Sequence, residues 1–192
     1  MIRKAATILF CLVFFMAALY GCRTTGPVSG GDVSSAPTSS LWDYDTVLVQ
    51  DFEVPANFPA PQDVGSVIAG KVVFQIQRYS QTYKLFNTIT KDEGKMPASG
   101  GSKILVINGD VREYTLPSIG KRIGRSFIPG GEFTGTAAFA AHYQFIEKST
   151  GKIIYETDLR TTSTGNADTV DYAMERNAEA AARVVYQHKV GK

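Results

Sequence analysis

The chain has 192 residues, 44% of them hydrophobic, with 20 basic and 18 acidic side chains. Two basic residues, Arg3 and Lys4, stand at its start, and the remainder is electrically balanced. A nucleic-acid-binding domain usually carries a basic stripe, because phosphate contacts supply much of its affinity. The composition therefore argues against nucleic acid as a partner, and the length suffices for one domain with its own core.

The first 21 residues have the order of a secretory signal peptide. Arg3 and Lys4 form a positive start, residues 5–19 are almost all apolar, and Gly21 precedes Cys22. The apolar run is shorter than the about 20 residues that a membrane-spanning helix needs. We expect residues 1–21 to be removed on export.

Residues 19–22, Leu-Tyr-Gly-Cys, resemble the lipobox of bacterial lipoproteins, although Tyr20 is bulkier than the usual residue. The resemblance implies lipid transfer to Cys22, cleavage before it and further acylation, which palmitate labelling reports. Asp after the lipidated Cys retains many lipoproteins at the inner membrane, whereas this chain has Arg23. We therefore expect a lipid-anchored protein of the outer membrane that faces the periplasm. The alternatives are an ordinary signal peptide or an uncleaved anchor.

Cys11 and Cys22 are the only cysteines. With residues 1–21 removed and Cys22 acylated, the mature domain has no thiol, which excludes disulfides, thiol catalysis and zinc-cysteine sites. Residues 22–41 consist of this Cys and a segment rich in Gly, Ser, Thr and Pro, and they predict a flexible tether. We place a single folded domain at residues 42–192.

The first half of this domain predicts a strand, a helix and two more strands. Residues 46–52 are β-branched and apolar, prolines follow them, and Asp63 is placed to cap a helix. Residues 85–90 and 104–114 predict the two further strands. The expected packing face of the helix, at spacings of three and four, comprises Val64, Val67, Ile68, Val72, Ile76 and Tyr79.

The second half predicts a hairpin and a final helix. From Phe133 the apolar pattern has a period of two, and a turn at Thr150-Gly151 leads into residues 153–162. Asp168 or Thr169 starts the last helix. The expected buried faces comprise Phe133, Ala137, Phe139, Tyr143 and Phe145 of the strand, opposite Thr134, Thr136, His142 and Gln144, and Val170, Met174, Ala178, Ala181, Val185 and His188 of the helix.

The element order is strand, helix, four strands, helix. It predicts an α/β (α+β) domain with a mixed or antiparallel sheet of about five strands and two helices packed on it. Residues 46–52, 107–111, 122–131 and 149–154 resemble a bacterial family called domain of unknown function 4410. The element order is more distantly similar to the amino-terminal domain of TolB and to the periplasmic domain of the curli-secretion lipoprotein CsgG. These resemblances imply a periplasmic interaction module and not an enzyme.

The chain offers few candidates for chemistry. Residues 65–71 match most of a phosphate-binding loop, but Val72 stands where a Ser or Thr must hold magnesium. His142 and His188 lack metal-ligand spacing, and no Gly-x-Ser-x-Gly nucleophile motif is present. We therefore assign no catalytic, cofactor-binding or metal-binding residue. Paired carboxylates, which we expect to be solvated loop charges, are Asp43 with Asp45 and Asp92 with Glu93.

The irregular segment 115–131 mixes cations with apolar residues, and loops of this length are often functional or disordered. Lys121, Arg122, Arg125 and Phe127 are its candidate partner-binding residues, and a plain connector is the alternative.

The sequence favours a non-catalytic interaction or assembly module of the cell envelope. We expect it to be held at the outer membrane by lipid on Cys22, with envelope proteins or further copies of itself as partners. A lipoprotein that binds lipid, glycan or peptidoglycan is the alternative. A hydrolase stays open as well, because residues of a site assembled in space are not adjacent in the sequence.

The lipid assignment is tested by Cys22→Ala. This variant should stay unprocessed or be released from membranes, because lipid transfer and lipoprotein-type cleavage both require the thiol. Incorporation of radiolabelled palmitate, combined with membrane fractionation, measures both effects. Equal labelling of the wild type and the variant would contradict the assignment.

Overall fold

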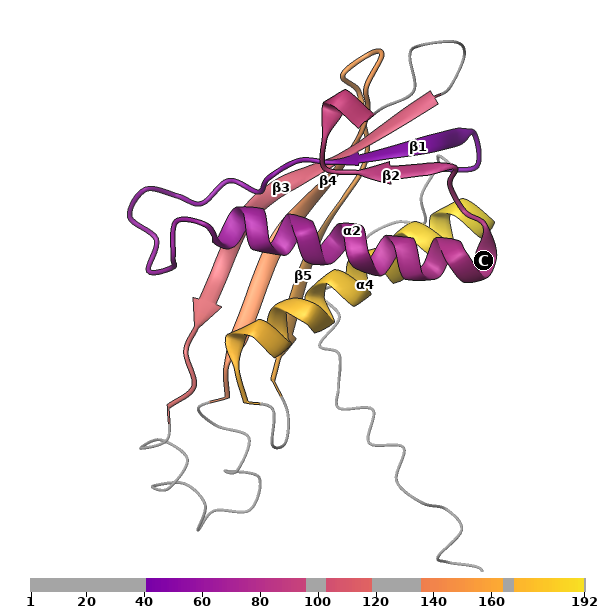
Figure 1. Ribbon diagram of the computed structural model, residues 1–192. Helices are drawn as coiled ribbons and strands as arrows, with labels where there is room; N and C mark the ends of the chain where they lie inside the picture. The colour runs from indigo at the N-terminus through magenta and orange to yellow at the C-terminus, as the bar shows by residue number, and fades with distance from the viewer. Residues whose placement is uncertain (1–40, 96–102, 119–135, 164–167, 192) are drawn as a thin grey trace, which may run out of the picture.

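The computed structural model describes residues 41–95, 103–118, 136–163 and 168–191. Figure 1 shows its elements in the predicted order, which confirms the α+β fold class. In chain order they are β1 (Tyr44–Val49), α2 (Val64–Tyr83), β2 (Thr88–Thr90), the 3-10 helix η1 (Glu93–Lys95), β3 (Lys103–Thr115), β4 (Ala138–Glu147), β5 (Ile153–Thr162) and α4 (Val170–Val190).

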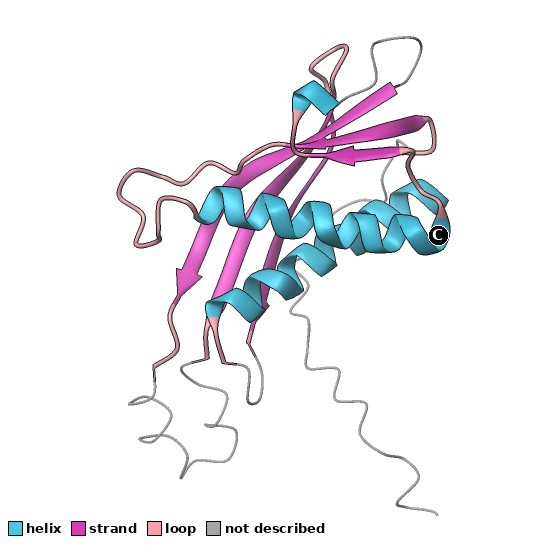
Figure 2. Ribbon diagram, viewed as in Figure 1, coloured by secondary structure: helices cyan, strands magenta, loops and turns pink. Residues whose placement is uncertain are grey.

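The five strands form one mixed sheet in the order β2-β1-β3-β4-β5. Strand β1 is parallel to β2 and β3, whereas β3, β4 and β5 are antiparallel to one another in turn. Helix α2 makes the crossover from β1 to β2. Figure 2 shows α2 and α4 on the same face of the sheet, so neither of these helices covers the opposite face.

Strand β4 has the alternation that the sequence predicts, whereas Phe133 and Thr134 of that prediction lie outside the described residues. Phe139, Tyr143 and Phe145 are buried towards the helices, while His142 and Gln144 are half-buried on the opposite face. In β1 the residues of both faces are buried, as a central strand of the parallel half requires.

The strand predicted at residues 85–90 is shorter than expected, because it begins only at Thr88. Lys84 ends α2 in the left-handed conformation, with a φ of 51°, and turns the chain back. Leu85 and Phe86 then fill the core beneath the helix end, and the backbone of Phe86 is held by the Ser80 hydroxyl at 3.1 Å. These two apolar residues belong to the core but not to the sheet.

Helix α2 starts at the predicted place, but two details of the prediction are wrong. The Asp63 side chain makes no capping hydrogen bond. Val67 is 40% exposed. The buried stripe of the helix is centred on Ile68, Val72 and Ile76. It extends away from Val67, to the side that carries Gly65 and Ala69. The helix is therefore rotated away from Val67, which faces solvent.

Helix α4 matches the prediction closely. The Thr169 side chain accepts a hydrogen bond from the backbone N–H of Tyr172 at 3.1 Å, and Gly191 ends the helix with a φ of 71°. All six residues of the predicted packing face are buried, His188 among them. Several of the buried residues are alanines, which let the helix approach the sheet closely.

A buried polar chain joins α4 to the sheet. The Tyr143 hydroxyl donates to Asn177 Oδ1 at 2.6 Å, and Asn177 Nδ2 donates to the Leu159 carbonyl at 2.9 Å. The Thr161 hydroxyl donates to the Ala173 carbonyl at 2.7 Å. Burial raises the pKa of Tyr143 well above its ordinary value, so the hydroxyl keeps its proton and stays a donor.

The chain enters the domain beside the end of α4. Leu41, at the end of the expected tether, is 1% exposed and belongs to the core, and its N–H donates to the His188 carbonyl at 3.1 Å. Lys189 Nζ donates to the carbonyls of Trp42 and Tyr44 at 2.7 and 2.5 Å. Burial lowers the pKa of Lys189, and the two carbonyls supply acceptors in place of water.

Two glycines of α2 give a matched test of this packing. A methyl group at Gly65 would lie 1.9 Å from the Phe52 carbonyl oxygen, whereas one at Gly70 would meet nothing within 4 Å. Gly65→Ala should therefore lower the free energy of unfolding by about 1–3 kcal/mol. Gly70→Ala should raise it by up to about 1 kcal/mol, because Ala favours helix. Urea unfolding measures both, and equal effects would show that Phe52 does not pack against the start of α2.

Candidate functional site

The residues assigned to lipid and partner binding from the sequence lie outside the described residues. Cys22 and the loop residues Lys121, Arg122, Arg125 and Phe127 are all in this group. Their roles stay predictions.

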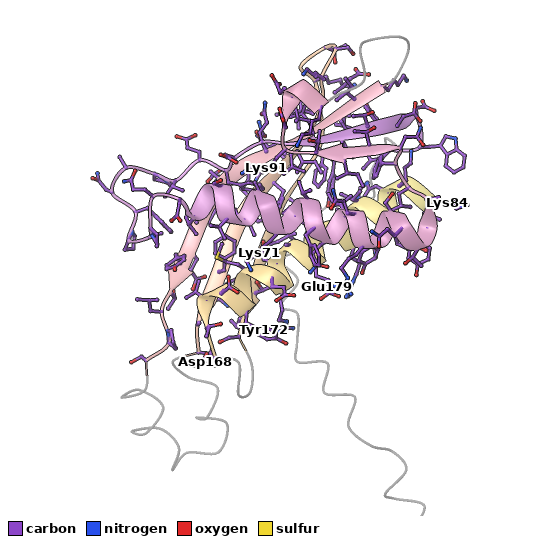
Figure 3. All side chains as sticks on the ribbon, viewed as in Figure 1. Lys71, Lys84, Lys91, Asp168, Tyr172 and Glu179 are labelled. Atoms are coloured by element: carbon purple, nitrogen blue, oxygen red, sulfur yellow. The ribbon has the colours of Figure 1, made fainter. Side chains whose placement is uncertain are left out.

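The stretch that resembles a phosphate-binding loop forms the first two turns of α2. Its glycine at position 65 lets the helix approach Phe52, and Lys71 Nζ forms an ion pair with Asp171 of α4 at 2.9 Å. Figure 3 shows Lys71 on the side of α2 that faces α4. The glycine and the lysine thus have structural roles in helix packing, which accounts for the motif without a nucleotide.

The candidate site is a group of polar side chains on the sheet face opposite the two helices, which we call the polar face. In the antiparallel register, His142 lies between Asp110 of β3 and Asp158 of β5. The flanking rows are Asn108, Gln144 and Glu156 on one side and Glu113, Ala140 and Arg160 on the other.

Both nitrogens of the His142 ring face carboxylates. Nδ1 lies 3.0 Å from Asp158 Oδ1, and Nε2 lies 3.7 Å from Glu156 Oε2. The imidazole side chain is only 15% exposed, while both carboxylates are largely exposed. His142 is therefore held in place by the β5 side chains beside it.

Ion pairs connect the rest of the polar face. Arg160 Nε and Nη2 donate to the two carboxylate oxygens of Glu113 at 2.7 and 3.0 Å. These hydrogen bonds hold the pKa of Glu113 below its ordinary value. Arg112 pairs with Asp110, two residues away along β3, through Nε and Nη2. A bidentate guanidinium-carboxylate pair has one preferred geometry, so these side chains present a fixed pattern of charge.

This arrangement differs from a Ser-His-Asp triad. In a Ser-His-Asp triad one ring nitrogen faces a carboxylate and the other takes the proton of the nucleophile. Here the second nitrogen faces Glu156. In the part of the chain that the structure describes, no three His, Cys, Asp or Glu side chains are grouped to hold a metal ion. The polar face offers charge and hydrogen bonds, which suit binding.

Exposed apolar side chains mark two further regions. Phe74 is 56% exposed and, with Val67, lies on the solvent side of α2. Trp42, which is 70% exposed, lies where the chain enters the domain, and Tyr83, which is 53% exposed, is the last residue of α2. The Tyr83 ring packs on Tyr186 with ring centroids 4.6 Å apart. Sequence reasoning missed this second region, because it depends on which chain ends meet in the fold.

Of the helices that the structure describes, none combines the length and the apolar character that crossing a bilayer requires.

No family model matches the chain, and no curated protein matches it. The likeness to domain of unknown function 4410, TolB and CsgG therefore stays a prediction.

Three solved structures are similar to this chain at low sequence identity. The PelC dodecamer from Paraburkholderia phytofirmans is 14% identical, with a TM-score of 0.49 over 74% of this chain and 89% of that chain. A protein of Xanthomonas campestris assigned to domain of unknown function 330 is 12% identical, with a TM-score of 0.45 over 82% and 95%. A minor lipoprotein from Acinetobacter baumannii is 14% identical, with a TM-score of 0.35 over 77% and 94%.

His188 makes stability depend on pH. The ring is buried against Tyr155, with ring centroids 4.3 Å apart, and burial lowers its pKa below the ordinary value of 6.5. Below pH 6.5 the unfolded chain therefore binds the proton more readily than the folded domain. The free energy of unfolding should fall as pH drops from 6.5 towards the folded-state pKa, by at most about 1.4 kcal/mol per pH unit for one proton.

Urea unfolding at a series of pH values tests this effect. His188→Gln should flatten the fall below pH 6.5, after correction for its own loss of packing at neutral pH. An unchanged pH profile in the variant would assign the effect to other groups.

Proposed function

We propose that the chain is a lipoprotein of the outer membrane that faces the periplasm, and that its domain is a non-catalytic interaction or assembly module of the cell envelope. The address comes from residues 1–22, whose charge, apolar run and Leu-Tyr-Gly-Cys end are those of a lipoprotein precursor.

The environment of His142 is the observation that carries the proposal. An imidazole on an open sheet face is the described group best suited to acid-base chemistry, yet both of its nitrogens face carboxylates. A general base must reach the proton that it removes, within hydrogen-bond distance or through one water. Here Nδ1 is within hydrogen-bond distance of Asp158 and Nε2 faces Glu156 at 3.7 Å, which supports a structural role within a binding surface.

The charges of the polar face favour a partner with cationic groups. The four carboxylates of Asp110, Glu113, Glu156 and Asp158 stand beside only two guanidinium groups, those of Arg112 and Arg160. The arginines already pair with Asp110 and Glu113, so Glu156 and Asp158 are the carboxylates that extend towards solvent. Charge complementarity of this kind gives specificity and speeds association.

Charge reversal on β5 tests this surface. Glu156→Lys/Asp158→Lys in the full chain should remove discrete protein adducts after formaldehyde cross-linking of intact cells. The melting temperature should change little, because both side chains are exposed. The matched control is Glu175→Lys/Glu179→Lys, which makes the same charge change on α4, away from the polar face, and should keep the adducts.

Three results would contradict the proposal. Equal loss of adducts in both double variants would show that the polar face is not the contact surface. Glycan or lipid that co-purifies in place of protein adducts would favour the ligand-binding alternative. A hydrolytic activity of the wild type that disappears in His142→Ala would show an enzyme.

A further inference from the structure

We propose that the end of the domain where the chain enters rests on the bilayer that holds the Cys22 lipid, with Trp42, Tyr83 and Val190 in contact with the lipid headgroups. We call these three residues the entry surface. The inference rests on the proposed lipoprotein function and adds a second, non-covalent membrane contact with a defined orientation of the domain.

Three chain segments meet at the entry surface. Trp42 follows Leu41, whose backbone N–H donates a hydrogen bond to the His188 carbonyl. The Trp42 carbonyl accepts a hydrogen bond from Lys189 Nζ. Helix α2 ends at Tyr83 and α4 at Val190. Figure 3 shows Lys84, the residue after α2, at this end of the molecule, and Asp168 and Tyr172 of the α4 start at the opposite end.

The side chains gathered there are of the kinds that favour a membrane surface. Three of the seven large hydrophobic side chains that are exposed in the described residues belong to the entry surface. Trp and Tyr are enriched at the boundary between headgroups and acyl chains, because their rings are apolar and their N–H or O–H bonds to water and headgroups. Exposed Trp and Tyr side chains at one end of a domain are accommodated at such a boundary.

The proposed lipid anchor is joined to the domain at this end. Residues 23–40 are all that separates Cys22, whose acyl chains lie in the membrane, from Leu41 in the core. For the coil that their composition predicts, the root-mean-square end-to-end distance is roughly 20–25 Å. The lipid on Cys22 therefore gives this end of the domain a high effective concentration of bilayer, whereas a protein partner must be captured from solution.

The backbone of the entry surface is fixed, so the contact also orients the domain. Lys189 is buried, bonds to the carbonyls of Trp42 and Tyr44, and lies 4.9 Å above the Phe86 ring. Trp42 thus cannot move away without breaking these bonds. Contact through Trp42 and Tyr83 places the starts of α2 and α4 away from the membrane.

The test uses the fact that Trp42 is the single tryptophan of the chain. The full mature lipoprotein is reconstituted into vesicles of phosphatidylethanolamine and phosphatidylglycerol, with and without brominated acyl chains. We expect a blue-shifted Trp emission that brominated lipid quenches and that aqueous acrylamide quenches weakly. Mass spectrometry of the same sample measures the lipid on Cys22.

The matched control moves the tryptophan to the other end of the domain. In Trp42→Phe/Leu116→Trp the new indole follows β3, at a position that is 67% exposed in the wild type. We expect acrylamide to quench it strongly and brominated lipid to leave it unchanged. The same lipid anchor is present in both proteins, so the difference reports on orientation.

The outcomes separate the inference from the proposed function. If Cys22 carries lipid and acrylamide quenches Trp42 as strongly as it quenches the control, the membrane contact is wrong and the lipoprotein assignment holds. If Trp42 is protected from both quenchers, a protein or a second copy covers it, and the membrane contact is wrong as well. If Cys22 carries no lipid, the proposed function fails and the inference fails with it.

Discussion

The hydrogen bond between the Tyr143 hydroxyl and Asn177 sets the position of α4, and much of the domain depends on that position. The pair is buried, and Asn177 also bonds to the Leu159 backbone, so a shift of the helix along β4 and β5 would leave polar groups unsatisfied. With α4 fixed, Asp171 in its first turn forms the ion pair with Lys71 of α2. Lys189 in its last turn donates a hydrogen bond to the Trp42 carbonyl, where the chain enters the domain. One buried contact therefore links the sheet, the helix pair and the chain entry.

Much of the fold follows from local patterns. Strands β4 and β5 and helix α4 each have a periodicity that separates buried side chains from exposed ones. Thr169 and Gly191 mark the two ends of the helix. The errors lie where tertiary packing decides. Leu85 and Phe86 are as apolar as strand residues, but the turn at Lys84 directs them into the core.

The candidate site is harder to predict, because it depends on register. Asp110, His142 and Asp158 lie in three strands and face one another only because the strands pair as they do, with irregularities near Glu113 and Ile146. Alternation shows that His142 faces away from the core, but it does not show which carboxylates lie beside it. The entry surface likewise depends on the meeting of Leu41 with His188, which no local pattern indicates.

The two proposed surfaces are geometrically compatible. The entry surface lies at the end of the domain that includes the ends of α2 and α4, whereas the polar face is the side of the sheet that these helices leave open. If the entry surface rests on the bilayer, the polar face stands beside the membrane and does not face it. Molecules anchored to the same leaflet then meet it laterally, and their confinement to the leaflet raises their effective concentration at this face. A surface of paired charges is suited to such encounters, because complementary charge selects among neighbours that are all close by.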